Sequence, residues 1–211
     1  MSTKAILWYF ADPMCSWCWG FSPVIEQIRS SYGDRLKIAL MLGGLRPWTT
    51  EPMSSKMREE ILHHWHEVHR LTGQSFSFDG ALPEGFIYDT EPACRAVITL
   101  AELSPDQTFS YFKSIQSAFY VGQMDVSKTD NLAELANQQG VETEQFLSRF
   151  DTEEARQKTR QHFLGTQQAG VKGFPSLVLQ QGSEFEFITR AYQHSDAISA
   201  RIDTWLEHHP A

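Results

Sequence analysis

The sequence predicts an α/β protein in which a mixed β-α-β … β-β-α sheet is interrupted by an all-helical insertion. Strand-like segments occur near the two ends of the chain, within residues 5–42 and 176–188. Between them, from about residue 51 to residue 168, nearly every segment has helical periodicity. We therefore predict a discontinuous domain formed by residues 1–46 and 169–211, with a helical insertion domain at 47–168.

The first forty or so residues predict the β-α-β unit. Residues 5–10 form a short apolar run that stops at Asp12-Pro13, as a strand entering a loop would. A helical pattern follows and ends at Gly33, which supplies a stop signal. Residues 36–42 are apolar except for Lys37 and predict a buried strand that ends at Gly43.

The middle of the chain predicts four to six helices. Breaks are expected where glycine or proline interrupts the periodicity, near Gly73, residues 82–85, Pro105 and Gly140. No internal repeat accompanies these helices. We therefore interpret these helices as a single insertion.

The C-terminal part predicts the β-β-α unit. Residues 176–180 read as a strand, residues 181–183 as a turn, and the alternating residues 184–188 as a second strand. A helix over about 195–207 follows.

Composition narrows the function classes. The chain has 18 basic and 26 acidic residues, a formal net charge of -8, and no block of consecutive lysines or arginines, which argues against nucleic-acid binding. No stretch approaches the roughly 18 apolar residues that cross a bilayer. We therefore predict a soluble cytoplasmic protein with no membrane partner.

The most informative motif is Cys15-Ser16-Trp17-Cys18, between the first strand and the first helix. Two thiols on the first turn of a helix lie within disulfide reach, and the helix N-terminus favours a thiolate. The alternative is half of a zinc site, but the third cysteine, Cys94, has no neighbouring cysteine or histidine to complete one. We therefore predict a redox dithiol and no metal site.

Two motifs, together with the helical block between them, make the chain resemble the thioredoxin superfamily, specifically its disulfide bond formation protein A-like (DsbA-like) branch with a helical insertion. They are residues 12–20, which contain the two cysteines, and residues 170–176, which lead into the third strand and resemble the family's cis-proline loop. Within that branch the chain is similar to FrnE-type proteins and to protein-disulfide isomerases. The resemblance implies a thioredoxin fold.

The resemblance also implies roles for individual residues. Cys15 would attack a substrate disulfide and Cys18 would resolve the mixed disulfide, with Ser16 and Trp17 tuning the redox potential. A cis bond at Pro175 would bring Phe174 against the cysteines, where its backbone can pair with an extended peptide.

One position departs from the family pattern. Many thioredoxin-like proteins carry a buried acid six residues before the nucleophile, but this chain has Tyr9 there. Asp12 is the carboxylate closest in sequence to the cysteines and is a candidate for proton transfer. The alternative is that Asp12 only satisfies N–H groups of its own loop.

The expected function is that of a thiol-disulfide oxidoreductase, of the isomerase or reductase kind, without a metal or organic cofactor. Its partners would be protein or small-thiol disulfides, with glutathione as an optional co-substrate, and the protein would be a monomer or weak homodimer. An alternative is a glutathione-dependent isomerase or transferase, like 2-hydroxychromene-2-carboxylate isomerases and kappa-class transferases, which typically place serine where Cys15 stands. A third hypothesis is a redox-silent peptide-binding module.

Three further features have structural interpretations. His63, His64, His66 and His69 share a helical stretch, which we interpret as a polar helix face rather than a metal or substrate site. Cys94 has the periodicity of a buried small hydrophobe. Aromatic residues cluster around the two motifs and predict an apolar rim for unfolded clients, with Trp8 and Phe21 assigned to packing instead.

Overall fold

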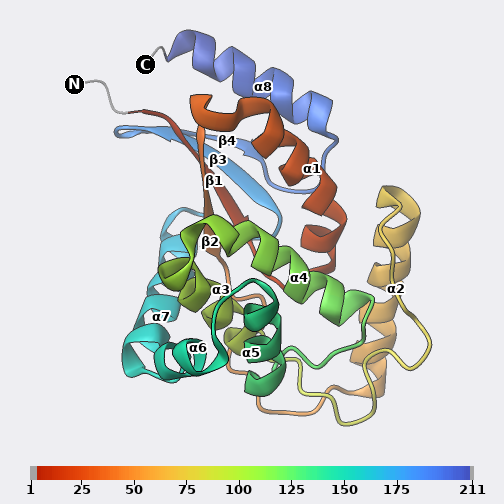
Figure 1. The fold of residues 1–211 in the computed structure, drawn as a ribbon. Coiled ribbons are helices and arrows are strands. Elements are labelled where there is room, and N and C mark those ends of the chain that lie inside the picture. The colour runs from red at the N-terminus through yellow and green to blue at the C-terminus, as the bar shows by residue number, and fades with distance from the viewer. Residues whose placement is uncertain (1–3, 210–211) are drawn as a thin grey trace.

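A four-stranded mixed sheet unites the two ends of the chain (Figure 1). The computed structural model describes residues 4–209, with the side chain of Asp34 left out. The strands are β1 (Ile6–Ala11), β2 (Lys37–Leu42), β3 (Ser176–Gln181) and β4 (Glu184–Thr189), in the order β2-β1-β3-β4. β1 runs parallel to β2 and antiparallel to β3, and β3 is antiparallel to β4. The predicted mixed sheet is confirmed.

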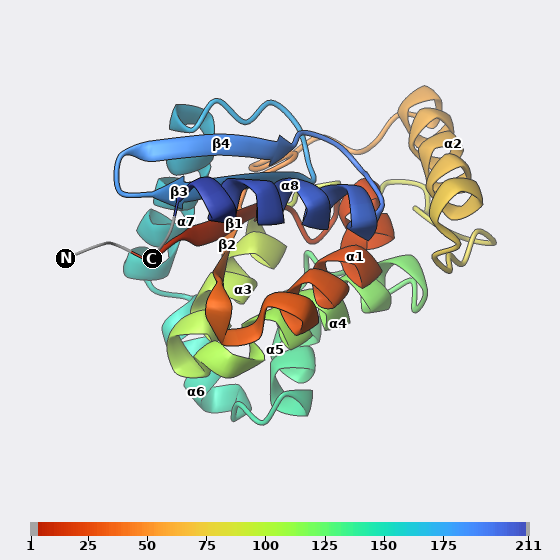
Figure 2. The ribbon, with the colours of Figure 1, turned by 90° about the horizontal axis from the view of Figure 1, so that it is seen from above.

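Helices α1 (Ser16–Tyr32) and α8 (Ser195–His208) lie together against one face of the sheet (Figure 2). Leu7 and Tyr9 of β1 alternate with residues that face the other way, and both are fully buried in this core. The Tyr32 hydroxyl donates to the carboxylate of Asp203 at 2.9 Å and so joins the two helices. Trp8, between Leu7 and Tyr9, lies on the opposite face in a smaller apolar cluster with Phe10 and Val178.

Six α-helices lie between β2 and β3 in the described part of the chain, at the upper end of the predicted range. They are α2 (Ser55–Thr72), α3 (Glu91–Leu103), α4 (Thr108–Tyr120), α5 (Thr129–Gln138), α6 (Thr143–Phe150) and α7 (Glu153–Gln168). Short 3₁₀ turns occur at Gly33–Arg35 and Pro105–Gln107. α2 begins after the Ser54 cap and ends at Gly73, whose φ of 74° is left-handed, so the predicted break there is confirmed.

The insertion contacts the sheet through α7. The ring Nδ1 of His162 accepts a hydrogen bond from the Leu42 amide at 3.2 Å, and the Thr166 hydroxyl donates to the Leu42 carbonyl at 3.2 Å. Both bonds meet the last residue of β2, where the chain leaves the sheet.

β2 is an edge strand, so the prediction of a buried strand is wrong. Lys37 is exposed, the next four residues are half-buried, and only Leu42 is buried. Its apolar side chains are partly covered by neighbouring helices, including α7, although no strand pairs with its outer edge. A mostly apolar run therefore did not distinguish a partly covered strand from a fully buried one.

No helix between residues 4 and 209 is both long enough and apolar enough to cross a membrane.

Candidate active site

The two cysteines lie at the start of α1, as the sequence predicts. The loop after β1 is closed by a hydrogen bond from the Cys15 amide to the Asp12 carbonyl, at 3.1 Å. Cys15 is the N-cap residue, with extended backbone, and Cys18 lies in the first helical turn. Cys15 therefore lies at the positive end of the helix dipole, a position that favours a negative charge.

The two thiols differ in accessibility. Cys15 is 5% exposed and Cys18 is fully buried, and both are free thiols. Burial raises the pKa of Cys18 well above its ordinary value, and the adjacent Cys15 thiol raises it further. The pair thus consists of Cys15, which keeps a small exposed area, and Cys18, which is fully buried and holds its proton.

The loop before β3 covers Cys15. The Phe174-Pro175 peptide bond is cis, as predicted. The Cys15 thiol donates to the Phe174 carbonyl, with 3.7 Å between Sγ and the oxygen. The Phe174 ring lies on Gly43, where a Cβ atom would approach the ring to 1.8 Å, so this turn after β2 requires glycine.

Asp12 is fully buried and lies beside the thiols. Its Oδ1 accepts from the Met14 amide at 2.8 Å, and its Oδ2 accepts from the Leu45 amide at 2.7 Å. Burial raises the pKa of Asp12, and these hydrogen bonds to its charged form oppose the rise. A backbone hydrogen bond from Asp12 also reaches Cys18. Asp12 does satisfy its own loop, as the alternative proposed, but it also contacts the buried thiol.

Cys94 belongs to this site, which the sequence did not indicate. It is fully buried on α3, as expected, but its thiol donates to Asp12 Oδ2 at 3.3 Å. Burial raises the pKa of Cys94 well above its ordinary value, and the Asp12 charge adds to the rise, so the thiol stays a donor. No local pattern could have revealed this contact, because the two residues are 82 positions apart.

Two buried tyrosines complete the interior of the site. Tyr9, in place of the family's acid, is fully buried, and its pKa is raised well above the ordinary value by burial and then by Cys18 and Cys15. The Tyr88 hydroxyl donates to the Met14 carbonyl, immediately before Cys15, and burial raises its pKa too. Both phenols therefore stay neutral around the dithiol.

One aromatic residue that was expected at the rim, Trp19, lies in the core instead. Ser16 and Trp17 are half-buried, and the Trp17 ring lies 6.3 Å from that of Tyr192. Trp19 is buried and stacks on Tyr120, so it belongs to the core. Trp48, which was not among the expected exposed aromatic residues, is 55% exposed on the turn after β2.

The histidine-rich stretch of α2 is a polar helix face, as interpreted. His66 stacks on Phe78 with 3.9 Å between ring centroids, and His69 Nδ1 lies 2.6 Å from the Gln74 carbonyl. His64 lies 3.7 Å from the Glu67 carboxylate. Across the described residues, no three His, Cys, Asp or Glu side chains are grouped so as to hold a metal ion.

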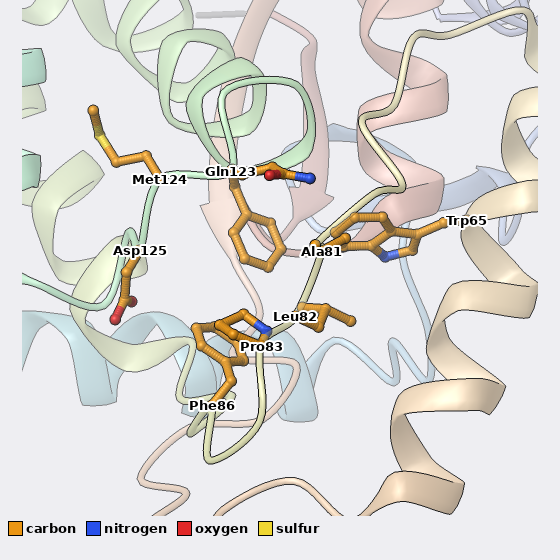
Figure 3. A pocket seen from close by; sticks show the side chains of 10 residues that line it. Trp65, Ala81, Leu82, Pro83, Phe86, Gln123, Met124 and Asp125 are labelled. Atoms are coloured by element: carbon orange, nitrogen blue, oxygen red, sulfur yellow. The ribbon is translucent and has the colours of Figure 1, made fainter.

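A separate pocket of about 140 Å³ lies in the insertion (Figure 3). It is lined mainly by apolar and aromatic side chains, among them Trp65, Pro83, Phe86, Phe119 and Met124. None of the residues around the thiols lines it. The pocket is therefore not part of the candidate active site.

Comparisons with known proteins converge on one family. The model of the DSBA-like thioredoxin domain matches residues 6–197. A candidate protein disulfide isomerase from Nitrosomonas europaea has 48% identity and a TM-score of 0.94, covering 98% of this chain and 99% of its own. The cytosolic disulfide reductase DsbM from Pseudomonas aeruginosa has 28% identity and a TM-score of 0.81, covering 96% of this chain and 99% of its own. DsbM has also been solved with GSH.

More distant curated relatives are longer proteins. The ClpXP adapter protein SpxH from Halalkalibacterium halodurans is 23% identical over 82% of this chain. The chain spans 57% of the length of that relative and 56% of the length of SpxH from Shouchella clausii.

Proposed function

Because this chain belongs to the DSBA-like thioredoxin domain family, a family of thiol-disulfide oxidoreductases, we propose that it is a disulfide reductase or isomerase acting through Cys15 and Cys18. The observation that carries the proposal is the placement of the two sulfurs. Cys15 lies at the helix N-terminus beneath the Phe174 carbonyl, and Cys18 is buried behind it.

The proposed reaction proceeds in two exchange steps. The Cys15 thiolate attacks one sulfur of a substrate disulfide, forms a bond to it, and releases the other sulfur as a thiolate. Cys18 then loses its proton and attacks the Cys15 sulfur, which releases the second substrate thiolate. The substrate gains two electrons and the protein ends as the Cys15–Cys18 disulfide. In isomerisation, a second thiol of the substrate attacks the mixed disulfide instead, and the protein leaves reduced.

Asp12 supports the second step. The Cys18 thiol holds its proton because burial raises its pKa, so it needs an acceptor before it can attack. The backbone of Asp12 forms a hydrogen bond with the Cys18 thiol, and the charge of its buried carboxylate acts on the same thiol. The raised pKa of Asp12 makes it a better proton acceptor than an exposed aspartate. We assign it the proton-transfer role.

The rim residues hold the substrate. Ser16 and Trp17 flank Cys15 on the half-exposed side of the motif. Phe174 and Pro175 offer backbone next to the Cys15 sulfur, to which an extended peptide or a small disulfide can bind.

Glutathione is the small thiol that we propose as reductant, since DsbM has been solved with GSH. Two glutathione molecules would reduce the Cys15–Cys18 disulfide and form one glutathione disulfide. A cytoplasmic location belongs to the same proposal, because DsbM is a cytosolic disulfide reductase.

An equilibrium redox titration in glutathione buffers, read by tryptophan fluorescence and by thiol counting, tests the proposal. The wild-type protein should show one two-electron transition, which Cys15→Ser and Cys18→Ser should each abolish. Intact mass should show a stable glutathione adduct on Cys15 of Cys18→Ser. If Cys15 and Cys18 never pair, the proposal is wrong. Consumption of glutathione by Cys18→Ser with an electrophile would favour the glutathione-dependent isomerase or transferase.

A further inference from the structure

The turn after β2 fixes Arg46 next to the active site. The Arg46 amide donates to the Thr90 hydroxyl at 3.1 Å, and the Thr90 amide donates to the Arg46 carbonyl at 3.2 Å. Thr90 is fully buried before α3. The preceding residue, Leu45, donates its amide to Asp12. The backbone of Arg46 is thus held in place one residue from the contact with the buried carboxylate.

The guanidinium group of Arg46 lies over Tyr88, a residue of the site. Its central carbon is 5.7 Å from the centroid of the Tyr88 ring, within the range of a cation–π contact. The hydroxyl of the same tyrosine donates to the Met14 carbonyl, directly before Cys15. A single aromatic side chain therefore separates the guanidinium from the loop that bears the reactive thiol.

This guanidinium has no anionic partner among residues 4–209. No carboxylate lies within 4.0 Å of it, and its only hydrogen-bond contact is from Nη1 to the Met57 sulfur at 3.7 Å. The neighbouring acid, Asp89, uses Oδ1 to accept the Trp48 and Glu91 amides. By contrast, the buried Arg95 is paired with Glu91 at 2.9 Å.

A half-buried arginine without an oxygen acceptor fits an anion from outside the chain. Guanidinium is always charged and presents a planar set of N–H donors that matches a carboxylate with two parallel hydrogen bonds. The protein itself carries a formal net charge of -8, so an anionic substrate needs a local cation to approach the thiol.

We propose that Arg46 is the anchor for a carboxylate group of glutathione or glutathione disulfide while its sulfur reacts with Cys15. This role rests on the proposed function. In it, the contact between Arg46 and the glutathione carboxylate determines specificity for the small substrate. Reduced protein converts one glutathione disulfide into two glutathione molecules as Cys15 and Cys18 become a disulfide, and the reverse reaction reduces the protein.

The test compares two disulfides that differ in charge. Fully reduced protein is mixed with glutathione disulfide or with uncharged hydroxyethyl disulfide, and the rate constant of oxidation is followed by tryptophan fluorescence. Arg46→Gln should lower the rate constant with glutathione disulfide on the order of tenfold, since a charge-assisted hydrogen-bond pair is lost. The rate constant with hydroxyethyl disulfide should stay within about twofold. Arg46→Lys keeps the positive charge but cannot donate two parallel hydrogen bonds to a carboxylate. Its rate constant with glutathione disulfide should lie between those of the wild type and Arg46→Gln.

Lys37→Gln is the matched control, because it removes an exposed positive charge at the opposite end of β2. It should leave both rate constants unchanged. An Arg46→Gln protein that loses rate equally with both disulfides, or with neither, would overturn the proposal, because Arg46 would then act on the thiols or not at all. If neither disulfide oxidises the wild-type dithiol, the proposed function itself fails.

Discussion

One buried carboxylate, that of Asp12, connects three parts of the chain that are far apart in sequence. It accepts hydrogen bonds from the loop after β2 and from Cys94 on α3, while the backbone of the same residue contacts Cys18. The Cys94 hydrogen bond favours the ionised form of Asp12 and so lowers its pKa, against the larger effect of burial. Cys94 can therefore set the pH at which Asp12 accepts a proton.

Replacing Cys94 should shift the pH dependence of the second exchange step. Cys94→Ala removes a donor that favours the charged form of Asp12, so the pKa of Asp12 should rise. The rate at which Cys18 resolves a mixed disulfide with glutathione should then have its midpoint at a correspondingly higher pH. Stopped-flow measurement of that rate between pH 4 and pH 9 checks the prediction.

Two matched variants separate this effect from a general loss of packing. Cys94→Ser keeps a donor of similar size, so its midpoint should lie closer to that of the wild type. Asp12→Asn should remove the midpoint altogether. Equal profiles for Cys94→Ala and the wild type would show that the thiol does not act on the carboxylate.

At the scale of elements, the turn after β2 and the loop before β3 form one contact. The Phe174 ring occupies the space that any side chain on Gly43 would need. The next residue, Gly44, has a φ of 65° and lies against Phe163, so this turn also requires glycine there. The loop that presents its carbonyl to Cys15 is therefore positioned by a glycine turn on another strand.

Gly43→Ala should displace the Phe174 loop and slow disulfide exchange, because the added Cβ cannot fit beside the ring. A displacement of about 1 Å at a reacting group can lower a rate up to 100-fold, and we expect a loss of at least tenfold. Gly173→Ala is the matched control on the same loop, since an added Cβ there meets no atom within 4 Å. Similar rates for the two variants would contradict this assignment.

Most elements were predictable because their signals are local. The strand before the cysteines, the helix that begins at Ser16 and the two C-terminal strands follow directly from periodicity and from glycine or proline breaks. The cover of β2 was not predictable, because it depends on a helix more than a hundred positions later in the chain. Local sequence patterns carry no information about such a neighbour.

At the scale of the whole molecule, α7 connects the helical insertion to the sheet through hydrogen bonds to Leu42. Burial lowers the pKa of His162 to about 4, so its ring is neutral and can accept the Leu42 amide proton. Protonation would remove that acceptor. We propose that residues 1–46 and 169–211 form one domain and residues 47–168 a helical insertion domain. The hydrogen bonds between α7 and Leu42 are among the contacts between the two.

Acidification should weaken the protein through His162. A folded-state pKa below the ordinary 6.5 means that the unfolded chain binds this proton more readily. The contribution is fully present above pH 6.5 and is lost as the pH falls toward 4, roughly 1 to 2 kcal/mol between pH 7 and pH 5. Urea unfolding at the two pH values should show a smaller loss for His162→Gln than for the wild type. The exposed His63→Gln should behave as the wild type does, and a loss in His162→Gln equal to that of the wild type would disprove the link.

The site was predictable where its residues lie in short motifs. Cys15, Cys18 and the Phe174-Pro175 bond were found from the residues around them, and the family they indicated is confirmed. Cys94, Tyr88 and Arg46 were missed because each reaches the site through a tertiary contact. The departure at Tyr9 was visible in the sequence, and Asp12, three residues later, was already a candidate for proton transfer.

The distance along the chain between Cys15 and Phe174 bears on the protein's synthesis. The ribosome makes Cys15 159 positions before Phe174, whose loop covers it. While the intervening residues are made, the nascent chain therefore carries both thiols without the Phe174 carbonyl and without β3, the strand that pairs with β1 from the C-terminal side. Until the Phe174 loop has been made, these cysteines lack that cover and are open to oxidation by other disulfides.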